Sequence, residues 1–488
     1  MSTRATVRPR STTGLLFLLA ALTGVAALLF SGEDAPPPKW NVLMIVPDTV
    51  RGDHLSANGY FRETTPNLDR LAREGTNFTR AISAAPRTWQ SYTTIMTGLY
   101  PPHHGVRFLF DFGLDPRVPT IATELKKAGY ATQCFDRLPF MRRMLGGGGF
   151  DEFHDAPSST DKSVVRAAWA WISQHRDEPF FAFVRLNGPH WPYILPPSEV
   201  EDFESCADQD HSFNLSTTRL TGLGTPVPGQ GIKLKYKDEY RRIMFDTNVS
   251  ERQRSHRIAH YDAELRQTDL QIGWLLDEMR AAGLMDTTIV VILSDHGESF
   301  GEHGYWQHGP RVDGPVLRVP FILRLPRRHP AHAAGRTIDG IVRTVDAAPT
   351  VLAAVAVPVP DGLDGTNLLP FVARGAVPEL WAYAETGKDF VGVDPDRHLE
   401  GVPGKHRMIR KADWKLVYVP RPNGPEYRLY DLQADPGETR NVVREHPAKA
   451  EELRALLRGI LDTDEDASTH TRALTDQEAE QLRKLGYM

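Results

Sequence analysis

The chain has few cysteines and no excess of basic residues. Only Cys134 and Cys206 occur among its 488 residues, which excludes a zinc cluster built from thiolates. A disulfide between them is allowed in an exported protein, but it is not favoured, because Cys134 lies in a strand-like stretch and is expected to pack as a small apolar side chain. The formal net charge is -5, so no basic surplus argues for a nucleic-acid partner.

One long apolar run stands out near the N-terminus. Residues 14–30 carry no charge, and Arg4, Arg8 and Arg10 precede them. A basic region before an apolar stretch is typical of a secretory signal or an uncleaved anchor. With 17 residues the run is at the short limit for a membrane-spanning helix. We therefore interpret residues 1–34 as a signal peptide or an N-terminal membrane anchor, and the lack of a clear cleavage site favours the anchor. The remaining chain is then exported, either anchored with its catalytic domain outside the cytoplasm or secreted or periplasmic.

The length and the apolar content predict more than one folding unit. Apolar residues make up 41% of the chain, which is enough for a large core. We expect a large α/β domain over residues 35–374 and a smaller α+β unit over residues 375–488. Within the first domain, residues 196–255 lack clear periodicity and are rich in glycine and proline. They are interpreted as an insertion over the functional site, with a surface loop as the alternative.

Two short apolar runs organise the predicted sheet. Residues 41–46 and 289–293 are continuous and rich in β-branched side chains, a pattern typical of parallel strands that are buried on both faces. Asp48 follows the first run, and Asp295 and His296 follow the second. Ligands bind outside the carboxyl ends of the strands in open α/β sheets, so the two carboxylates are expected to meet around a cation. Taken alone, each could instead be a capping or turn residue.

A third feature is a predicted helix that begins near Thr88. Pro86 precedes it, and Gly98 follows its last turn. The free backbone N–H groups at a helix N-terminus favour an anion, so a hydroxyl at this point suits a site for an anionic group. On the helix alone, the simpler interpretation of Thr88 is an ordinary N-cap.

The other elements are predicted from periodicity. Helices are expected over residues 65–74, 164–175, 261–282, 344–356, 448–461 and 476–485, and a strand over 179–186. Short alternating runs over residues 407–410, 414–418 and 427–432 predict a small antiparallel sheet. The fold class is therefore α/β, with a large and mostly parallel sheet sandwiched by helices and a small C-terminal antiparallel sheet.

Several blocks together resemble one known family. They include VLMIVPDTVRGDHLSANGY, TIMTGLYPPHHGV, NGPHWPY, VVILSDHGESFGEHG and RLYDLQADPGETRN. In this order, from about Asn41 to Asn441, they are similar to the sulfatase family of the alkaline phosphatase superfamily. The resemblance implies an alkaline phosphatase-like fold and one divalent metal ion. It implies metal ligands at Asp48, Thr88, Asp295 and His296. It places the histidines that surround the transferred group at His104, His190, His303 and His308.

The chain departs from this family at the nucleophile. The family motif C/S-x-P-x-R supplies a Cys or Ser that is oxidised to formylglycine, whereas this chain has Thr88-Trp89-Gln90-Ser91-Tyr92. A threonine cannot become formylglycine, so we expect none here and predict that Thr88 acts as a metal-activated nucleophile. Thr49 stands where the family has a second aspartate, and a histidine follows Asp295. Both changes favour Zn²⁺ or Mn²⁺ over Ca²⁺.

Three functions follow from these observations. The leading hypothesis is a metal-dependent hydrolase of sulfate or phosphate esters, with a small-molecule, glycan or lipid ester as substrate. The second is a phosphoethanolamine- or phosphoglycerol-type head-group transferase, although such enzymes usually carry several membrane spans and this chain has one candidate. The third is a non-catalytic relative that keeps the fold for binding, motivated by the missing proline and arginine of the motif. The sequence makes no prediction about oligomeric state.

Overall fold

The computed structural model describes most of the chain after residue 38. The described residues are 39–107, 112–137, 140–146, 149–155, 160–191, 193, 248–386, 405–461 and 471–473. The predicted signal or anchor, most of the insertion, Cys206 and the helix predicted over 476–485 lie outside them. No helix within the described residues has the length and apolar character needed to cross a membrane. The described residues from Asn41 onward form one compact unit, and the domain boundary near residue 374 stays a prediction.

The main sheet contains nine strands of the described residues, in the order β10-β2-β11-β7-β1-β6-β4-β5, with β12 paired to β2. Their bounds are β1 Asn41–Pro47, β2 Thr76–Ile82, β4 Ala131–Asp136, β5 Glu152–Asp155, β6 Phe180–Leu186, β7 Thr288–Leu293, β10 Arg318–Val319, β11 Phe321–Arg324 and β12 Arg336–Arg343. The run from β7 to β5 is parallel throughout, and β12 is parallel to β2. Only β10 and β11 pair antiparallel to their neighbours. The predicted mostly parallel sheet is confirmed.

The register of the two central strands brings their polar ends together. Every residue of β1 and β7 is buried, as their continuous apolar pattern predicted. Ile45 of β1 lies opposite Ile292 of β7. Asp48 and Asp295 come three residues later in the chain, just beyond the ends of β1 and β7. The pairing of the strands therefore places both carboxylates at the same edge of the sheet.

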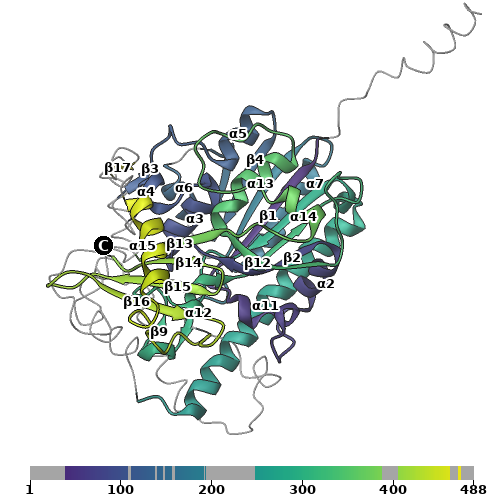
Figure 1. Cartoon of the computed structure of the whole chain (residues 1–488). Helices are drawn as coiled ribbons and strands as arrows, with labels where there is room; N and C mark the ends of the chain where they lie inside the picture. The colour runs from purple at the N-terminus through teal and green to yellow at the C-terminus, as the bar shows by residue number, and fades with distance from the viewer. Residues whose placement is uncertain are drawn as a thin grey trace, which may run out of the picture. The chain divides into compact units, whose positions relative to one another are not determined.

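Helices cover both faces of this sheet (Figure 1). On one face, α2 (Pro66–Glu74), α7 (Asp161–Gln174) and α11 (Glu251–Ala281) share an apolar core with β1 and β6. On the other face lies α3 (Thr88–Thr97), whose Tyr92 hydroxyl donates to the carbonyl of Val46 at 2.9 Å. Helices α5 (Ile121–Lys127) and α13 (Ala347–Ala354) pack beside α3. The predicted sandwich of helices around a sheet is confirmed.

The small C-terminal sheet is also present. It has four antiparallel strands, β13 (Trp381–Glu385), β14 (Arg407–Lys411), β15 (Trp414–Val419) and β16 (Glu426–Asp431). The sequence predicted the last three and missed β13. Helix α15 (Pro447–Leu461) packs on the sheet through Leu453 and Leu457. The helix and the sheet lie together in the yellow-green part of Figure 1.

Short elements connect these layers. They are α4 Pro101–His104, α6 Phe140–Met144, α12 Gly314–Leu317 and α14 Leu369–Arg374, the strand pairs β3 Phe112–Leu114 with β17 Thr471–Ala473 and β8 Ser299–Phe300 with β9 Trp306–Gln307, and the 3-10 helices η1 Gly52–His54, η2 Ser56–Asn58, η3 Leu284–Asp286, η4 Glu302–Gly304 and η5 Thr344–Asp346. Helix α11 begins ten residues before its predicted start at residue 261, because Ser250 and Gln253 form a capping box there.

Candidate active site

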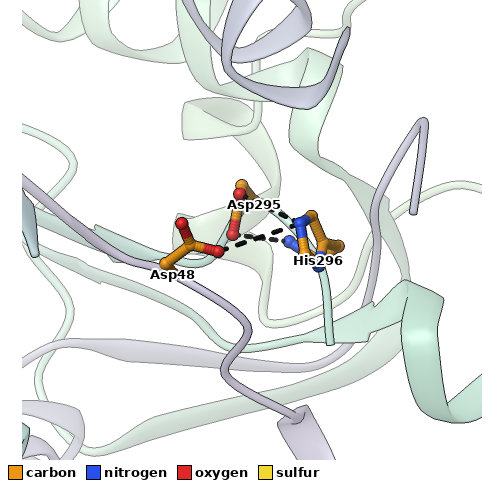
Figure 2. A group of neighbouring side chains, drawn as sticks. All are labelled: Asp48, Asp295 and His296. Carbon is orange, nitrogen blue, oxygen red and sulfur yellow. Dashed lines mark hydrogen bonds and ion pairs between the residues drawn. The ribbon is translucent and has the colours of Figure 1, made fainter. Parts of the chain in front are cut away.

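Three residues converge where β1 and β7 end. The metal-ligating atoms of Asp48, Asp295 and His296 all lie within 4.8 Å of one another, and all three residues are buried. Figure 2 shows both carboxylates turned toward the imidazole, whose Nε2 is 3.3 Å from Oδ2 of Asp295 and 3.8 Å from Oδ1 of Asp48. The structure therefore brings together the three side chains that the sequence placed on two distant loops.

Hydrogen bonds between the two loops hold this arrangement. Oδ1 of Asp295 accepts from the backbone N–H of Thr49 at 3.2 Å and from that of His296 at 2.9 Å. Thr49 has a positive φ of 59°, an uncommon conformation for a β-branched residue that the surrounding contacts must support. One such contact is the Tyr261 hydroxyl of α11, which donates to the carbonyl of Thr49 at 2.9 Å. The turn after β1 is thus built around the side chain after β7.

The cluster has unsatisfied acceptors that point into it. Oδ1 of Asp48 and Oδ2 of Asp295 are buried and lack a hydrogen-bond partner within the described part of the chain. Nδ1 of His296 lies 3.0 Å from the carbonyl of Gly297, a contact in which the ring must donate, so Nε2 carries the lone pair. Two carboxylate oxygens and one imidazole nitrogen therefore face a common point. This donor set suits a divalent metal ion, and Asp48, Asp295 and His296 could hold one.

The pKa values of the three residues are shifted by burial and by neighbouring charges. Burial and the neighbouring Asp48 raise the pKa of Asp295 well above its usual value. Burial by itself would raise the pKa of Asp48, but the Arg185 guanidinium and nearby imidazoles hold it below its usual value. Burial lowers the pKa of His296 to about 4, so this ring is neutral near pH 7. Without a cation, the negative charge of Asp48 therefore favours the protonated form of Asp295.

Thr88 lies beside this cluster. It is the first residue of α3, as predicted, and its hydroxyl oxygen is 3.4 Å from Nε2 of His296. Thr88 is partly exposed, whereas the three clustered residues are buried. One turn further along α3, the Ser91 hydroxyl donates to the carbonyl of Asp295. This bond ties the helix to the loop after β7 and keeps the threonine hydroxyl next to the cluster.

Of the four predicted histidines, His308 lies beside His296, and His190 lies beside His308. The ring of His308 lies 4.3 Å from that of His296 and 5.1 Å from that of His190, measured between centroids. Nδ1 of His308 is 2.9 Å from Oε1 of Glu298, so its Nε2 remains for another partner. Burial, followed by the neighbouring imidazoles and Arg87, lowers the pKa of His308 well below its usual value.

The other two histidines make different contacts. His104 is buried, its Nε2 lies 3.1 Å from the Thr94 hydroxyl, and its Nδ1 accepts from the backbone N–H of Val106 at 3.1 Å. Burial lowers its pKa to about 3. His303 is grouped with Asp313 and Glu438, within 4.8 Å of their carboxylate oxygens. A role for His104 and His303 beside the transferred group stays a prediction, and neither makes a hydrogen bond or ion pair with Thr88 in the described chain.

Sequence reasoning assigned no role to two buried residues, Arg185 and Glu298. Arg185 in β6 donates to Oδ2 of Asp48 and, at 3.0 Å, to Oδ1 of Asp136. Glu298 is buried, and its Oε1 forms a hydrogen bond with Nδ1 of His308. Arg185 could have been noticed as the one charged residue in the apolar run FFAFVRL, and Glu298 as part of the loop after β7.

Comparison with known proteins gives consistent matches. The sulfatase family model matches residues 40–357, and a model described as N-sulphoglucosamine sulphohydrolase, C-terminal, matches residues 301–465. An arylsulfatase of Clostridium perfringens is 26% identical over 88% of this chain and 96% of its own length.

Solved structures share the fold. A protein in complex with its substrate D-glucosamine-2-N,6-O-disulfate superposes with a TM-score of 0.68 and 21% identity, over 88% of this chain and 98% of its own. The phosphonate monoester hydrolase of Agrobacterium radiobacter superposes with a TM-score of 0.64 and 22% identity, over 89% of this chain and 100% of its own. At these identities the superpositions support the fold alone.

Proposed function

Because the chain belongs to the sulfatase family, it is a hydrolase of ester bonds, and we propose that Thr88 is its nucleophile. The proposal is carried by one observation: the partly exposed Thr88 hydroxyl lies 3.4 Å from His296, at the edge of a buried cluster with two unpaired carboxylate oxygens. A hydroxyl in this position replaces the formylglycine of the family motif.

Asp48, Asp295, His296 and the Thr88 hydroxyl would hold one divalent cation. When bound, such an ion supplies Lewis-acid polarisation of the ester and lowers the pKa of a hydroxyl ligand. The donor set has two carboxylates and one imidazole, and Thr49 stands where a further aspartate would add negative charge. These features favour Zn²⁺ or Mn²⁺ over Ca²⁺.

The residues around Thr88 divide the chemistry among them. The Thr88 hydroxyl gives its proton to water, its oxygen attacks the sulfur or phosphorus atom and forms a bond to it, and the bond to the leaving oxygen breaks. Backbone N–H groups at the start of α3 bind the remaining ester oxygens. The leaving oxygen takes a proton from His190, whose ring lies 5.1 Å from that of His308 between centroids. Water then releases the group from Thr88 and restores the hydroxyl.

The substrate is proposed to be a sulfate, phosphate or phosphonate ester of a small molecule or glycan. The relatives named above support this range, since the structure of one is in complex with its substrate, a disulfated glucosamine, and another is a phosphonate monoester hydrolase. The transferase alternative has no support among these relatives, and the presence of Asp48, Asp295 and His296 argues against the non-catalytic alternative. We also propose that residues 1–34 direct the protein out of the cytoplasm.

The test compares wild type with Thr88→Val and Thr88→Ser on aryl sulfates, aryl phosphodiesters and aryl phosphonates. Valine keeps the branched shape and removes the hydroxyl, so kcat should fall by roughly 10³-fold or more, while serine should retain part of the activity. Intact mass after quenching should reveal a sulfuryl or phosphoryl adduct on wild type and none on the valine variant. Equal turnover by wild type and Thr88→Val would remove Thr88 from the mechanism.

A further inference from the structure

Arg185 is a charged side chain in the middle of the core. It lies in β6, all of whose residues are buried, and only 1% of its surface is exposed. One end of the guanidinium donates to Oδ2 of Asp48, and the other donates to Oδ1 of Asp136 at 3.0 Å. Its plane lies against the Tyr92 ring of α3, 5.5 Å from the centroid. A buried charge is tolerated only when it is paired, and this one is paired on both sides.

The bridge decides how Asp48 is presented to the cluster. Arg185 lies opposite Val46 in the paired strands, so the backbone of β6 places its guanidinium beside the end of β1. Because Oδ2 of Asp48 accepts from Arg185, only Oδ1 is left to face His296. A planar guanidinium held at both ends by carboxylates has little freedom to move, so Asp48 is fixed in this orientation.

Arg185 also changes the charge that a cation meets. Asp48 and Asp295 would present two negative charges, and the guanidinium in contact with Asp48 offsets one of them. Asp136 accepts from the opposite end of Arg185, so its charge is further from the cluster. The positive charge therefore weakens the attraction for a divalent ion, while it stabilises the carboxylates when no ion is bound.

We propose that Arg185 is the positioning residue of this cation site. Its guanidinium binds Oδ2 of Asp48, so that only Oδ1 faces the cluster, and its positive charge stabilises the carboxylates when no ion is bound but lowers the affinity for a cation. This inference rests on the proposed function only through the cation site. Its consequence is opposite to that of an ordinary supporting contact, since removal of Arg185 should tighten cation binding.

The experiment uses the full chain, stripped with a chelator, as wild type, Arg185→Met and Arg185→Lys. Calcium, manganese and zinc ions are titrated separately by calorimetry, and thermal unfolding is recorded with and without each ion. For Arg185→Met the Kd should tighten by roughly 10- to 100-fold, and most for Ca²⁺, because a hard ion depends most on charge. Its melting temperature should fall without an ion and recover when one is added. Arg185→Lys keeps the charge and should stay within a few-fold of the wild-type Kd.

A matched control is Arg324→Met. Arg324 is likewise buried in the sheet, in β11, but its guanidinium donates to the backbone carbonyls of Met285 and Thr288. Its loss should lower stability and leave every Kd unchanged. If Arg185→Met folds only with an ion present, the rate of ion loss to excess chelator replaces the titration, and slower loss than in wild type is expected.

An unchanged or weaker Kd for Arg185→Met, or ion loss as fast as in wild type, would overturn the inference. If wild type binds the ion and hydrolyses an ester through Thr88 while Arg185→Met shows that result, this inference alone fails. A wild-type protein that binds no divalent ion contradicts the proposed cation site and this inference with it.

Discussion

The two clustered carboxylates lead to an unusual prediction for Asp295→Asn. Oδ1 of Asp295 accepts from two backbone N–H groups, and an asparagine oxygen can keep both bonds. The substitution removes only the charge and the acceptor at Oδ2, which lacks a partner. We therefore expect the metal-free variant to be more stable than metal-free wild type, and its stabilisation by a divalent ion to be largely lost.

The magnitude follows from the separation of the charges. The facing oxygens of Asp48 and Asp295 are within 4.8 Å of each other. Two like charges at about 5 Å repel by about 3 kcal/mol at an effective dielectric constant of about 20. Arg185 offsets part of this repulsion, so Asp295→Asn should stabilise the metal-free protein by about 1–3 kcal/mol at neutral pH. Wild type should gain about 2.7 kcal/mol from an ion at about 100 times its Kd, and the variant should gain little.

The pH dependence has a definite sign. Burial and Asp48 raise the pKa of Asp295 in the folded state, so the metal-free native protein binds a proton that the unfolded chain releases above about pH 4. Stability of metal-free wild type should therefore decline as pH rises from about 4 toward the folded pKa, and Asp295→Asn should remove that contribution.

Urea denaturation of chelator-treated protein at several pH values measures both effects. Asp361→Asn, at an exposed position, is the control for loss of one carboxylate and should change little. The reasoning is refuted if metal-free Asp295→Asn is less stable than wild type at neutral pH, or if the ion still stabilises it as strongly.

Two further predictions concern the surroundings of the site. Burial by itself would raise the pKa of Glu385, but Lys405 and a neighbouring arginine hold it well below its usual value, so its contribution to stability is present above about pH 4.5 and is lost as pH falls. Glu385→Gln should cost about 3–5 kcal/mol in urea denaturation at neutral pH, and a cost under about 1 kcal/mol would contradict this. A Cβ on Gly297 would lie 2.2 Å from the carbonyl oxygen of Pro315, so Gly297→Ala should displace the loop after β7 and weaken cation binding by roughly tenfold or more. The control is Gly459→Ala in α15, whose Cβ meets nothing within 4 Å and should stabilise the helix by up to about 1 kcal/mol. If the two alanine variants had equal effects on cation affinity, the clash with Pro315 would not explain the loss.

Much of the site was predictable because its residues follow elements with strong local signals. The apolar runs that became β1 and β7 could be recognised by their continuity, and the start of α3 by Pro86 and Gly98. Since parallel strands end at the same edge of a sheet, the carboxylates that follow them could be paired without any structure.

Other features had no local signal. β13 is a short segment whose pairing with β14 decides its conformation, and the first turns of α11 are polar and lack the apolar period. The sequence blocks that contain His104 and His303 resemble the family as closely as the blocks that contain His190 and His308. Their side-chain contacts depend on Thr94 for the first and on Asp313 and Glu438 for the second, which no spacing along the chain specifies.

The order and chemistry of the residues determined by themselves that this protein has a mostly parallel sheet and that Asp48 and Asp295 follow two of its strands, because both depend on residue identity and local pattern. The tertiary structure alone decided which groups share the site. Arg185 binds Asp48 from a strand 137 positions away along the chain, and His308 turns to Glu298 instead of solvent. These contacts depend on how the strands pair and which side chains become buried. Both are properties of two segments together, so neither segment's sequence predicts them alone.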